Sequence, residues 1–205
     1  MGERGLHCVA LACSPRKDGN TALLAREALR GAASAGSTTH LIYLQDHHYA
    51  PCMACDGCFE TGRCVIEDDA GPIYQHLLAA DRVILAAPIF SMGICAQAKM
   101  FIDRAQQFWA TRYLLYRPVI ADAARRPERR GIFISTAGTR IPDVFAGALQ
   151  VARYFFKILE VRLVGTYCYP GVDERGAILK HPWALGEVYR AGQELGSERP
   201  VVPIS

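Results

Sequence analysis

Two short segments of the chain are apolar almost without interruption, at residues 6–13 (LHCVALAC) and 81–88 (DRVILAAP). A strand that is buried on both faces of a parallel sheet has this pattern, whereas a strand with one wet face alternates apolar and polar positions. Further apolar runs of strand length occur at residues 39–45, 130–138 and 161–169. We therefore predict five strands, most of them buried.

Segments with apolar residues at helical spacing lie between these strands. In the first, Leu23, Leu24, Ala28 and Leu29 share one helix face, and the preceding Asn20 and Thr21 can cap it. Similar patterns follow at residues 68–80, 95–116, 142–160 and 183–195. This alternation predicts an α/β fold of three layers, with a five-stranded parallel sheet between helices. We expect one domain at residues 1–196 and an extended tail at residues 197–205.

Composition narrows the class of protein. A net charge of +3 in 205 residues does not predict binding to nucleic acid, and no apolar run approaches the ~20 residues that cross a bilayer. The first residues do not resemble a cleaved leader, so we expect a soluble cytoplasmic protein whose thiols stay reduced. The Arg-rich run at residues 125–130 (RRPERR) predicts a solvated loop or, alternatively, a dock for an anionic cofactor such as NADPH.

The loop after the first strand, SPRKDGNT, offers polar groups just before a helix. Ser14, Arg16, Asn20 and Thr21 supply hydroxyl, guanidinium and amide groups, and the helix N-terminus adds backbone N–H donors that suit a phosphate. An ordinary strand-to-helix turn is the alternative. Neither the GxxxxGK[ST] nor the GxGxxG spacing is present, which disfavours a nucleoside triphosphate or a dinucleotide at this loop.

The loops after the third and fourth strands can approach a flat ring. The segment PIFSMG begins with a stiffening proline, and STAGT contains small residues that allow close backbone approach. In open parallel sheets, ligands bind outside the carboxyl ends of the strands, where these loops lie. The candidate ring-binding residues are Pro88, Ile89, Phe90, Ser91, Met92, Ser135, Thr136 and Gly138.

Taken together, SPRKDGNT, the segment DDAGPIYQHLLAADRVILAAPIFSMGICAQAKMFIDR and STAG resemble the NADPH-dependent FMN reductase branch of the flavodoxin-like fold. Members of that family often have Tyr where Phe90 stands. The resemblance implies strand order 2-1-3-4-5 and bound FMN. It places the FMN phosphate at Ser14, Arg16, Asn20 and Thr21, and the isoalloxazine ring along residues 88–92 and 135–138.

Half of the eight cysteines lie in thirteen residues, CMACDGCFETGRC, as an insert at residues 51–65. Four thiolates at C-x2-C-x2-C-x5-C spacing can ligate a [4Fe-4S] cluster, and Gly57 and Gly62 let the backbone turn around it. This pattern in a flavodoxin-like chain resembles the iron-sulfur flavoprotein subgroup. A zinc site and free or redox-active thiols remain alternatives. The proposed ligands are Cys52, Cys55, Cys58 and Cys64; the other four cysteines are expected to pack in the core.

These features predict an FMN-binding redox protein with a [4Fe-4S] cluster, which passes electrons from a donor such as NAD(P)H or a small redox protein to an acceptor. The cofactors carry the chemistry, so no catalytic acid, base or nucleophile is assigned. The alternatives are a cluster-free NAD(P)H-dependent FMN, quinone or metal reductase and a zinc-stapled binding module. The helix predicted at 95–116 carries an aromatic stripe, formed by Ile102, Gln106, Trp109, Tyr113 and Tyr116. Together with the family resemblance, this stripe predicts a homodimer or homotetramer with Trp109 between chains. The alternative is a single wide core-facing band whose aromatic edge is covered by the loop after Tyr116.

Overall fold

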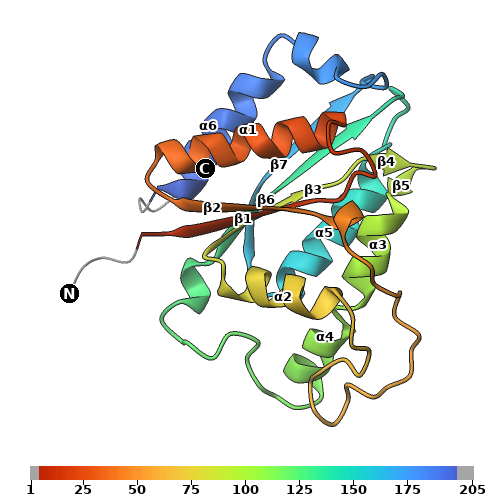
Figure 1. Ribbon diagram of the computed structural model, residues 1–205, viewed down its shortest axis with the longest axis vertical. Helices are drawn as coiled ribbons and strands as arrows, with labels where there is room; N and C mark the ends of the chain where they lie inside the picture. The colour runs from red at the N-terminus through yellow and green to blue at the C-terminus, as the bar shows by residue number, and fades with distance from the viewer. Residues whose placement is uncertain (1–4, 198–205) are drawn as a thin grey trace.

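The computed structural model describes residues 5–197 and contains a five-stranded parallel sheet between two layers of helices (Figure 1). The sheet order is β2-β1-β3-β6-β7, which is 2-1-3-4-5 when its strands are numbered along the chain, as predicted. All its neighbouring strands pair in parallel. The strands are β1 (His7–Ala12), β2 (Thr38–Tyr43), β3 (Arg82–Ala86), β6 (Arg130–Ala137) and β7 (Arg162–Pro170).

Helices cover both faces of the sheet. Helices α1 (Asn20–Ser34) and α6 (Ala184–Gly196) pack together on one face. The other face carries α2 (Ala70–Ala79), α3 (Ala96–Asp103), α4 (Gln106–Tyr113) and α5 (Ala146–Ile158) (Figure 1). Three short 3-10 turns lie in the connections between these elements: η1 (Leu44–Asp46), η2 (Arg126–Glu128) and η3 (Ala177–Lys180).

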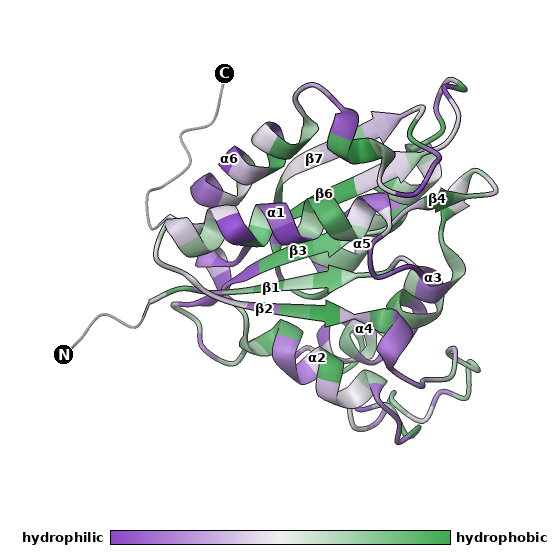
Figure 2. Ribbon diagram, turned by 45° about the horizontal axis from the view of Figure 1, so that its top comes forward, coloured by the Kyte–Doolittle hydropathy of each residue, from purple (hydrophilic) through white to green (hydrophobic). Residues whose placement is uncertain are grey.

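The central strands are mostly apolar because each contributes to two cores. On β1, Val9 and Leu11 pack toward α2 and α5, while Cys8 and Ala10 pack toward α1 and α6. All four side chains are fully buried. The hydropathy colouring shows the same apolar strands with helices above and below them (Figure 2). The continuous apolar pattern therefore has the cause that the sequence predicted, which is burial on both faces.

The prediction of one long helix over residues 95–116 is wrong. The chain forms α3 and α4 with a tight turn between them, where Arg104 and Ala105 donate i→i−3 hydrogen bonds to Phe101 and Ile102. The predicted aromatic stripe is broken at the same point. Ile102 is buried at the end of α3, whereas Tyr116 lies beyond α4 with 88% of its surface exposed.

A small hairpin that the sequence pattern did not predict follows β3. Its strands are β4 (Ile89–Phe90) and β5 (Gly93–Ile94), paired antiparallel. The two-residue turn between them needs positive φ angles, which Ser91 (48°) and Met92 (65°) adopt. Non-glycine residues rarely occupy this region, and such strain is concentrated at functional sites.

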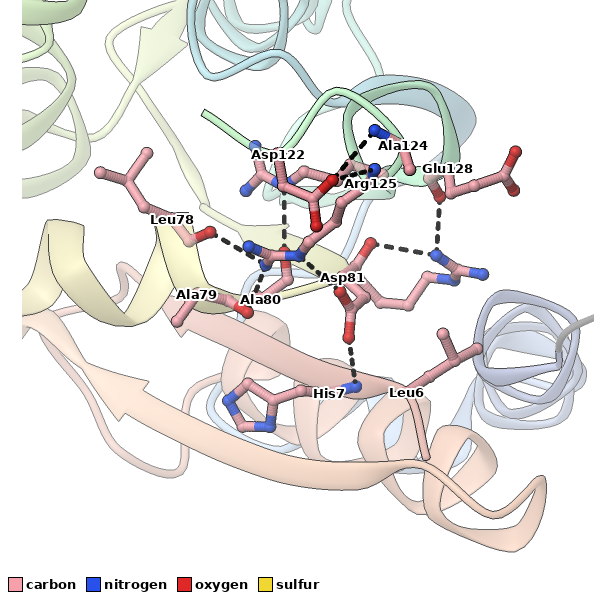
Figure 3. A network of polar contacts seen from close by, with 12 residues as sticks. Leu6, His7, Leu78, Ala79, Ala80, Asp81, Asp122, Ala124, Arg125 and Glu128 are labelled. Atoms are coloured by element: carbon pink, nitrogen blue, oxygen red, sulfur yellow. Dashed lines mark hydrogen bonds and ion pairs between the residues drawn. The ribbon is translucent and has the colours of Figure 1, made fainter. Parts of the chain in front are cut away.

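Arginines of the RRPERR run are built into the amino-terminal edge of the sheet. Arg125 donates to Asp81 at 2.8 Å and to the carbonyl oxygens of Leu78 and Ala79, and Asp81 also accepts the His7 amide (Figure 3). Arg129 is fully buried. The prediction of a solvated loop is therefore wrong for Arg129, and both guanidiniums bind protein groups at the edge opposite the loops predicted to bind a ligand.

Arg129 satisfies carbonyl groups that the end of α2 leaves without helical partners. Its guanidinium donates to Leu77 at 2.6 Å, to Ala80 at 3.0 Å and to Leu159. The last carbonyls of a helix need partners from outside the helix, and here one side chain supplies them. Burial, with a smaller effect of the neighbouring Arg125, lowers the pKa of Arg129 to about 10.

The predicted tail at 197–205 lies outside the described residues, except for Ser197. Among residues 5–197, no helix combines the length and the apolar character that a bilayer crossing requires.

We expect Arg129→Gln to lower the free energy of unfolding by at least about 2 kcal/mol, because a buried carbonyl without a partner costs about 1–3 kcal/mol. Urea denaturation followed by circular dichroism measures this loss. Arg30→Gln is the matched control, since Arg30 lies on the surface of α1 and pairs with Glu27 in the adjacent turn. Equal shifts in the two variants would contradict the role given to Arg129.

Candidate functional site

Three loops meet at the carboxyl edge of the sheet and enclose a cavity of about 110 Å³. The first follows β1, the second follows β3 and the third follows β6, as the sequence predicted. Nine of the predicted ligand residues line this cavity: Ser14, Arg16, Asn20, Thr21, Pro88, Ile89, Phe90, Thr136 and Gly138.

The loop after β1 leaves the start of α1 open. Gly19 is the N-cap residue, and no side chain caps the first N–H groups of the helix. A Cβ at Gly19 would lie 2.7 Å from Ser14 Oγ, so the loop closes this tightly only with glycine. Ser14 Oγ accepts the Arg16 amide at 3.1 Å, and the Arg16 side chain is exposed. Open helix amides beside a guanidinium fit an anionic group.

Two predicted ligand residues have other contacts. The Asn20 side chain donates to Glu174 O at 2.9 Å and accepts the Ile178 amide at 3.2 Å, so it ties the loop after β7 to the start of α1. Ser135 is fully buried and donates to Ala87 O at 2.7 Å. Asn20 still lines the cavity, whereas Ser135 lies beneath it.

The remaining two predicted residues lie at the tip of the β4–β5 hairpin. Ser91 and Met92 are exposed and do not line the cavity, although Phe90 on the same hairpin does. About half of the Phe90 surface is exposed. The hairpin thus presents an aromatic face at the rim of the cavity, where a planar ligand could stack.

The sequence prediction missed the contribution of the loop after β7. Val172, Asp173 and Arg175 line the same cavity, and Arg175 forms an ion pair with Asp18 of the first loop. The signal was available, because this loop also follows the carboxyl end of a predicted strand. What the sequence could not show is its closeness to a segment more than 150 residues earlier.

The four clustered cysteines converge on a second cavity, which also contacts the turn between α3 and α4. Cys52, Cys58 and Cys64 are half-buried and Cys55 is exposed. Burial raises the pKa of the Cys58 thiol, and the charges of the three other thiols act in the same direction. The cavity measures only about 20 Å³, so the loop would have to open outward to enclose a metal cluster.

The backbone of the cysteine loop turns sharply and fits closely against α4. Gly62 has a φ of 74°, and a Cβ there would lie 2.4 Å from Thr111 Oγ1. The Cys64 amide donates to Gln107 Oε1 at 3.2 Å, which fixes the last cysteine to the same helix. The prediction that a glycine lets this loop turn is confirmed at Gly62, where both the backbone angle and the contact require it.

Among the described residues, the thiols of the cysteine loop are not grouped closely enough to hold a metal ion. Four thiolates on one zinc ion lie about 2.3 Å from it and so crowd together. Within residues 5–197, no group of three or more His, Cys, Asp or Glu side chains is placed to hold one ion.

Cysteines outside the cluster loop are mainly structural. Cys8, Cys13 and Cys95 are fully buried, and Cys168 is half-buried. Cys95 precedes α3 and donates its thiol to Cys13 O at 3.3 Å. Burial raises the pKa of Cys95 to about 11, so it remains a thiol despite its position at a helix N-terminus.

A larger cavity of about 560 Å³ lies on the other side of Cys64, between the cysteine loop, α2 and α4. Three arginines line it: Arg63, Arg104 and Arg117. No carboxylate side chain is among its lining residues. The last cysteine of the loop thus borders a basic, solvent-connected space.

Comparison with known proteins places these features in a family. Residues 6–161 match the family described as NADPH-dependent FMN reductase. An iron-sulfur flavoprotein of Methanocaldococcus jannaschii is 42% identical over 98 residues, which are 48% of this chain and 51% of that protein. An iron-sulfur flavoprotein of Archaeoglobus fulgidus is 28% identical over 145 residues, covering 71% of this chain and 61% of that protein. The chain therefore spans about half to three fifths of the length of these relatives.

Solved structures share the fold at low sequence identity. A flavone reductase superposes with a TM-score of 0.70 at 16% identity, covering 93% of this chain and 62% of that protein. An NAD(P)H:quinone oxidoreductase from Methanothermobacter marburgensis gives a TM-score of 0.67 at 15% identity, covering 94% and 100%. With the family match over most of its length and ligand loops at the carboxyl edge of its sheet, the chain belongs to the NADPH-dependent FMN reductase family of flavin-dependent oxidoreductases.

Proposed function

We propose that this protein is an electron-transfer flavoprotein that binds FMN in the first cavity and a [4Fe-4S] cluster in the cysteine loop. The observation that carries the proposal is the convergence of all four clustered cysteines on one cavity, separate from the ligand loops. Helix α3 joins the two sites, since it begins beside the β4–β5 hairpin and ends at the cysteine cavity. Its eight residues span about 12 Å at 1.5 Å each.

The residues of the first cavity would hold FMN by its two ends. The phosphate would bind to the open amides of α1, Arg16 and the hydroxyls of Ser14 and Thr21, and Asn20 would hold the neighbouring loop in place. The ring would lie along residues 88–92 and beside Thr136 and Gly138. The chemistry supplied by the bound groups is two-electron exchange at the flavin and one-electron exchange at the cluster.

The second candidate is a cluster-free NAD(P)H-dependent FMN, quinone or metal reductase. The small size of the cysteine cavity favours it, because the loop closes on itself without a cluster. The names of the relatives and the full quartet of cysteines favour the cluster. In either case the proposed donor is NAD(P)H or a small redox protein. The basic cavity beside Cys64 suits an anionic acceptor or an acidic partner surface.

We also propose a homodimer or homotetramer. Around α4, Tyr113 and Leu114 are partly exposed and Tyr116 is almost fully exposed, and half-buried Trp109 packs against Phe59 of the cysteine loop. Exposed aromatic residues at one site are typical of interfaces between chains. A second subunit on this surface would cover the side of the cysteine loop that contacts Trp109.

Replacing Cys55 with Ala should remove the iron and acid-labile sulfide of the anaerobically purified protein and leave FMN bound, because the thiols and the flavin loops are separate segments. Iron and sulfide analysis beside flavin extraction measures both. Cys168→Ser is the control and should retain both groups. A full complement of iron and sulfide in Cys55→Ala would refute the four-cysteine assignment.

Arg16→Ala should weaken FMN binding tenfold or more and leave riboflavin binding unchanged, because only FMN has the phosphate. A hydrogen bond to a charged group contributes roughly 1.5–3 kcal/mol, and about 1.4 kcal/mol is a tenfold change. Quenching of flavin fluorescence measures both dissociation constants. Equal losses for the two flavins would show that the substitution disturbs the loop rather than a phosphate contact.

Sedimentation velocity at micromolar concentration should give the mass of a dimer or tetramer. Trp109→Ala combined with Tyr113→Ala should shift the protein toward the monomer, because the aromatic area is lost. His47→Ala, which changes an imidazole outside this surface, should leave the mass unchanged. A monomeric wild-type protein with its flavin and cluster bound would disprove this assembly.

A further inference from the structure

Both ends of the cysteine loop are joined by one side chain, Arg104, from the turn between α3 and α4. Its Nη1 donates to Ala50 O at 2.9 Å and to Asp68 Oδ2 at 2.6 Å, and its Nη2 donates to Ile66 O at 3.0 Å. The Ala50 amide also donates to Asp68 Oδ2 at 2.9 Å. The residues that precede Cys52 and those that follow Cys64 are therefore held together at one ion pair. We call this junction of residues 50, 66 and 68 the neck of the cysteine loop.

This ion pair is buried, with 1% of the Arg104 side chain and 13% of the Asp68 side chain exposed. Buried pairs are weak evidence for stability, because well-packed apolar residues of similar volume often stabilise a protein as well or better. The Arg104 position could therefore be filled by an apolar residue if its task were packing alone. Its polarity serves the hydrogen bonds that join the two ends of the loop.

One donor of Arg104 is not used. Its Nε is buried and has no hydrogen-bond partner among residues 5–197. The guanidinium lines the cavity on which the four cysteines converge, and it lies beside the Cys64 thiol. A buried N–H without a partner is rare in folded proteins, and at a ligand site it marks the position of an acceptor.

The backbone at Arg104 also indicates a functional position. The helical segment breaks into α3 and α4 at residues 104–105. Neither residue is Gly or Pro, which are the common local causes of a sharp break in a helix. A short tight turn within a helical segment often marks a functional position. The break places Arg104 against the cysteine loop rather than on a regular helix face.

We propose that Arg104 is the positioning residue of the cluster site: it closes the neck of the cysteine loop and donates its Nε–H to the Cys64 sulfur, which raises the reduction potential of the bound cluster. This inference rests on the proposed function. Reduction adds negative charge to a cluster that carries four thiolates, so a nearby cation and a hydrogen bond to a ligand sulfur stabilise the reduced state. The negative charge of Asp68 partly offsets the positive charge of Arg104.

The Arg104–Asp68 ion pair allows a test in which two substitutions shift the midpoint potential of the cluster in opposite directions. Arg104→Gln removes the cation and leaves Asp68 unpaired, so the midpoint potential should fall. Asp68→Asn removes the anion and leaves Arg104 unpaired, so the potential should rise. We expect at least a tenfold change in the one-electron equilibrium in each direction, which is about 59 mV. A redox titration of the reconstituted protein, followed by electron paramagnetic resonance, measures it.

Arg104→Lys and Arg30→Gln complete the set. Lysine keeps the charge but cannot hold the neck and contact Cys64 at once, so its potential should lie between those of the wild type and Arg104→Gln. Arg30, on the far face of the sheet, should have no effect. Potentials that move in the same direction in Arg104→Gln and Asp68→Asn, or that do not move, would overturn the proposal, because a purely structural neck makes the two variants equivalent.

Iron and sulfide content separates this proposal from the function on which it rests. A wild-type protein that takes up neither would refute the cluster itself. Loss of the cluster from both Arg104 variants and from Asp68→Asn would assign Arg104 to the neck alone and overturn the proposed hydrogen bond.

Discussion

The structure depends on one constraint, which is that every strand of the main sheet runs in the same direction. Each central strand is buried on both faces, so helices must cover both sides, and the carboxyl ends of all strands meet at one edge. That edge gathers the loops after β1, β3, β6 and β7 around a single cavity. The groups predicted to bind a phosphate and a flat ring are therefore brought together because their strands run in the same direction.

The two edges of the sheet have opposite chemistry. At the amino edge, Arg125 pairs with Asp81 and donates to a carbonyl group at the end of α2 (Figure 3). Arg129 donates to further carbonyl groups at the same helix end. At the carboxyl edge, the amides at the start of α1 have no side-chain cap, and Arg16 is exposed. The same residue type therefore stabilises the fold at one edge and lies exposed beside open helix amides at the other.

The cysteine loop is a separate unit attached to this scaffold. Hydrogen bonds near its ends bind it to Arg104 and Gln107, and Gly62 brings it against α4. The hydrogen bonds at its neck also change the pKa of Asp68. Burial would raise the pKa of this carboxyl group, but hydrogen bonds from Arg104 and from the Ala50 and Ala70 amides outweigh it and hold the pKa below its usual value. The neck is therefore kept charged at neutral pH.

The sequence by itself determined the strand and helix order, the loops that carry the ligand groups and the four cysteines, because these depend on periodicity and on spacing within short segments. Tertiary structure decided the rest. Asn20 binds residues 174–178, Arg129 reaches both α2 and the end of α5, and the helix predicted over 95–116 breaks where Arg104 enters the cysteine loop. Each of these depends on partners far away in the chain, and no local pattern of residues encodes a contact between distant segments.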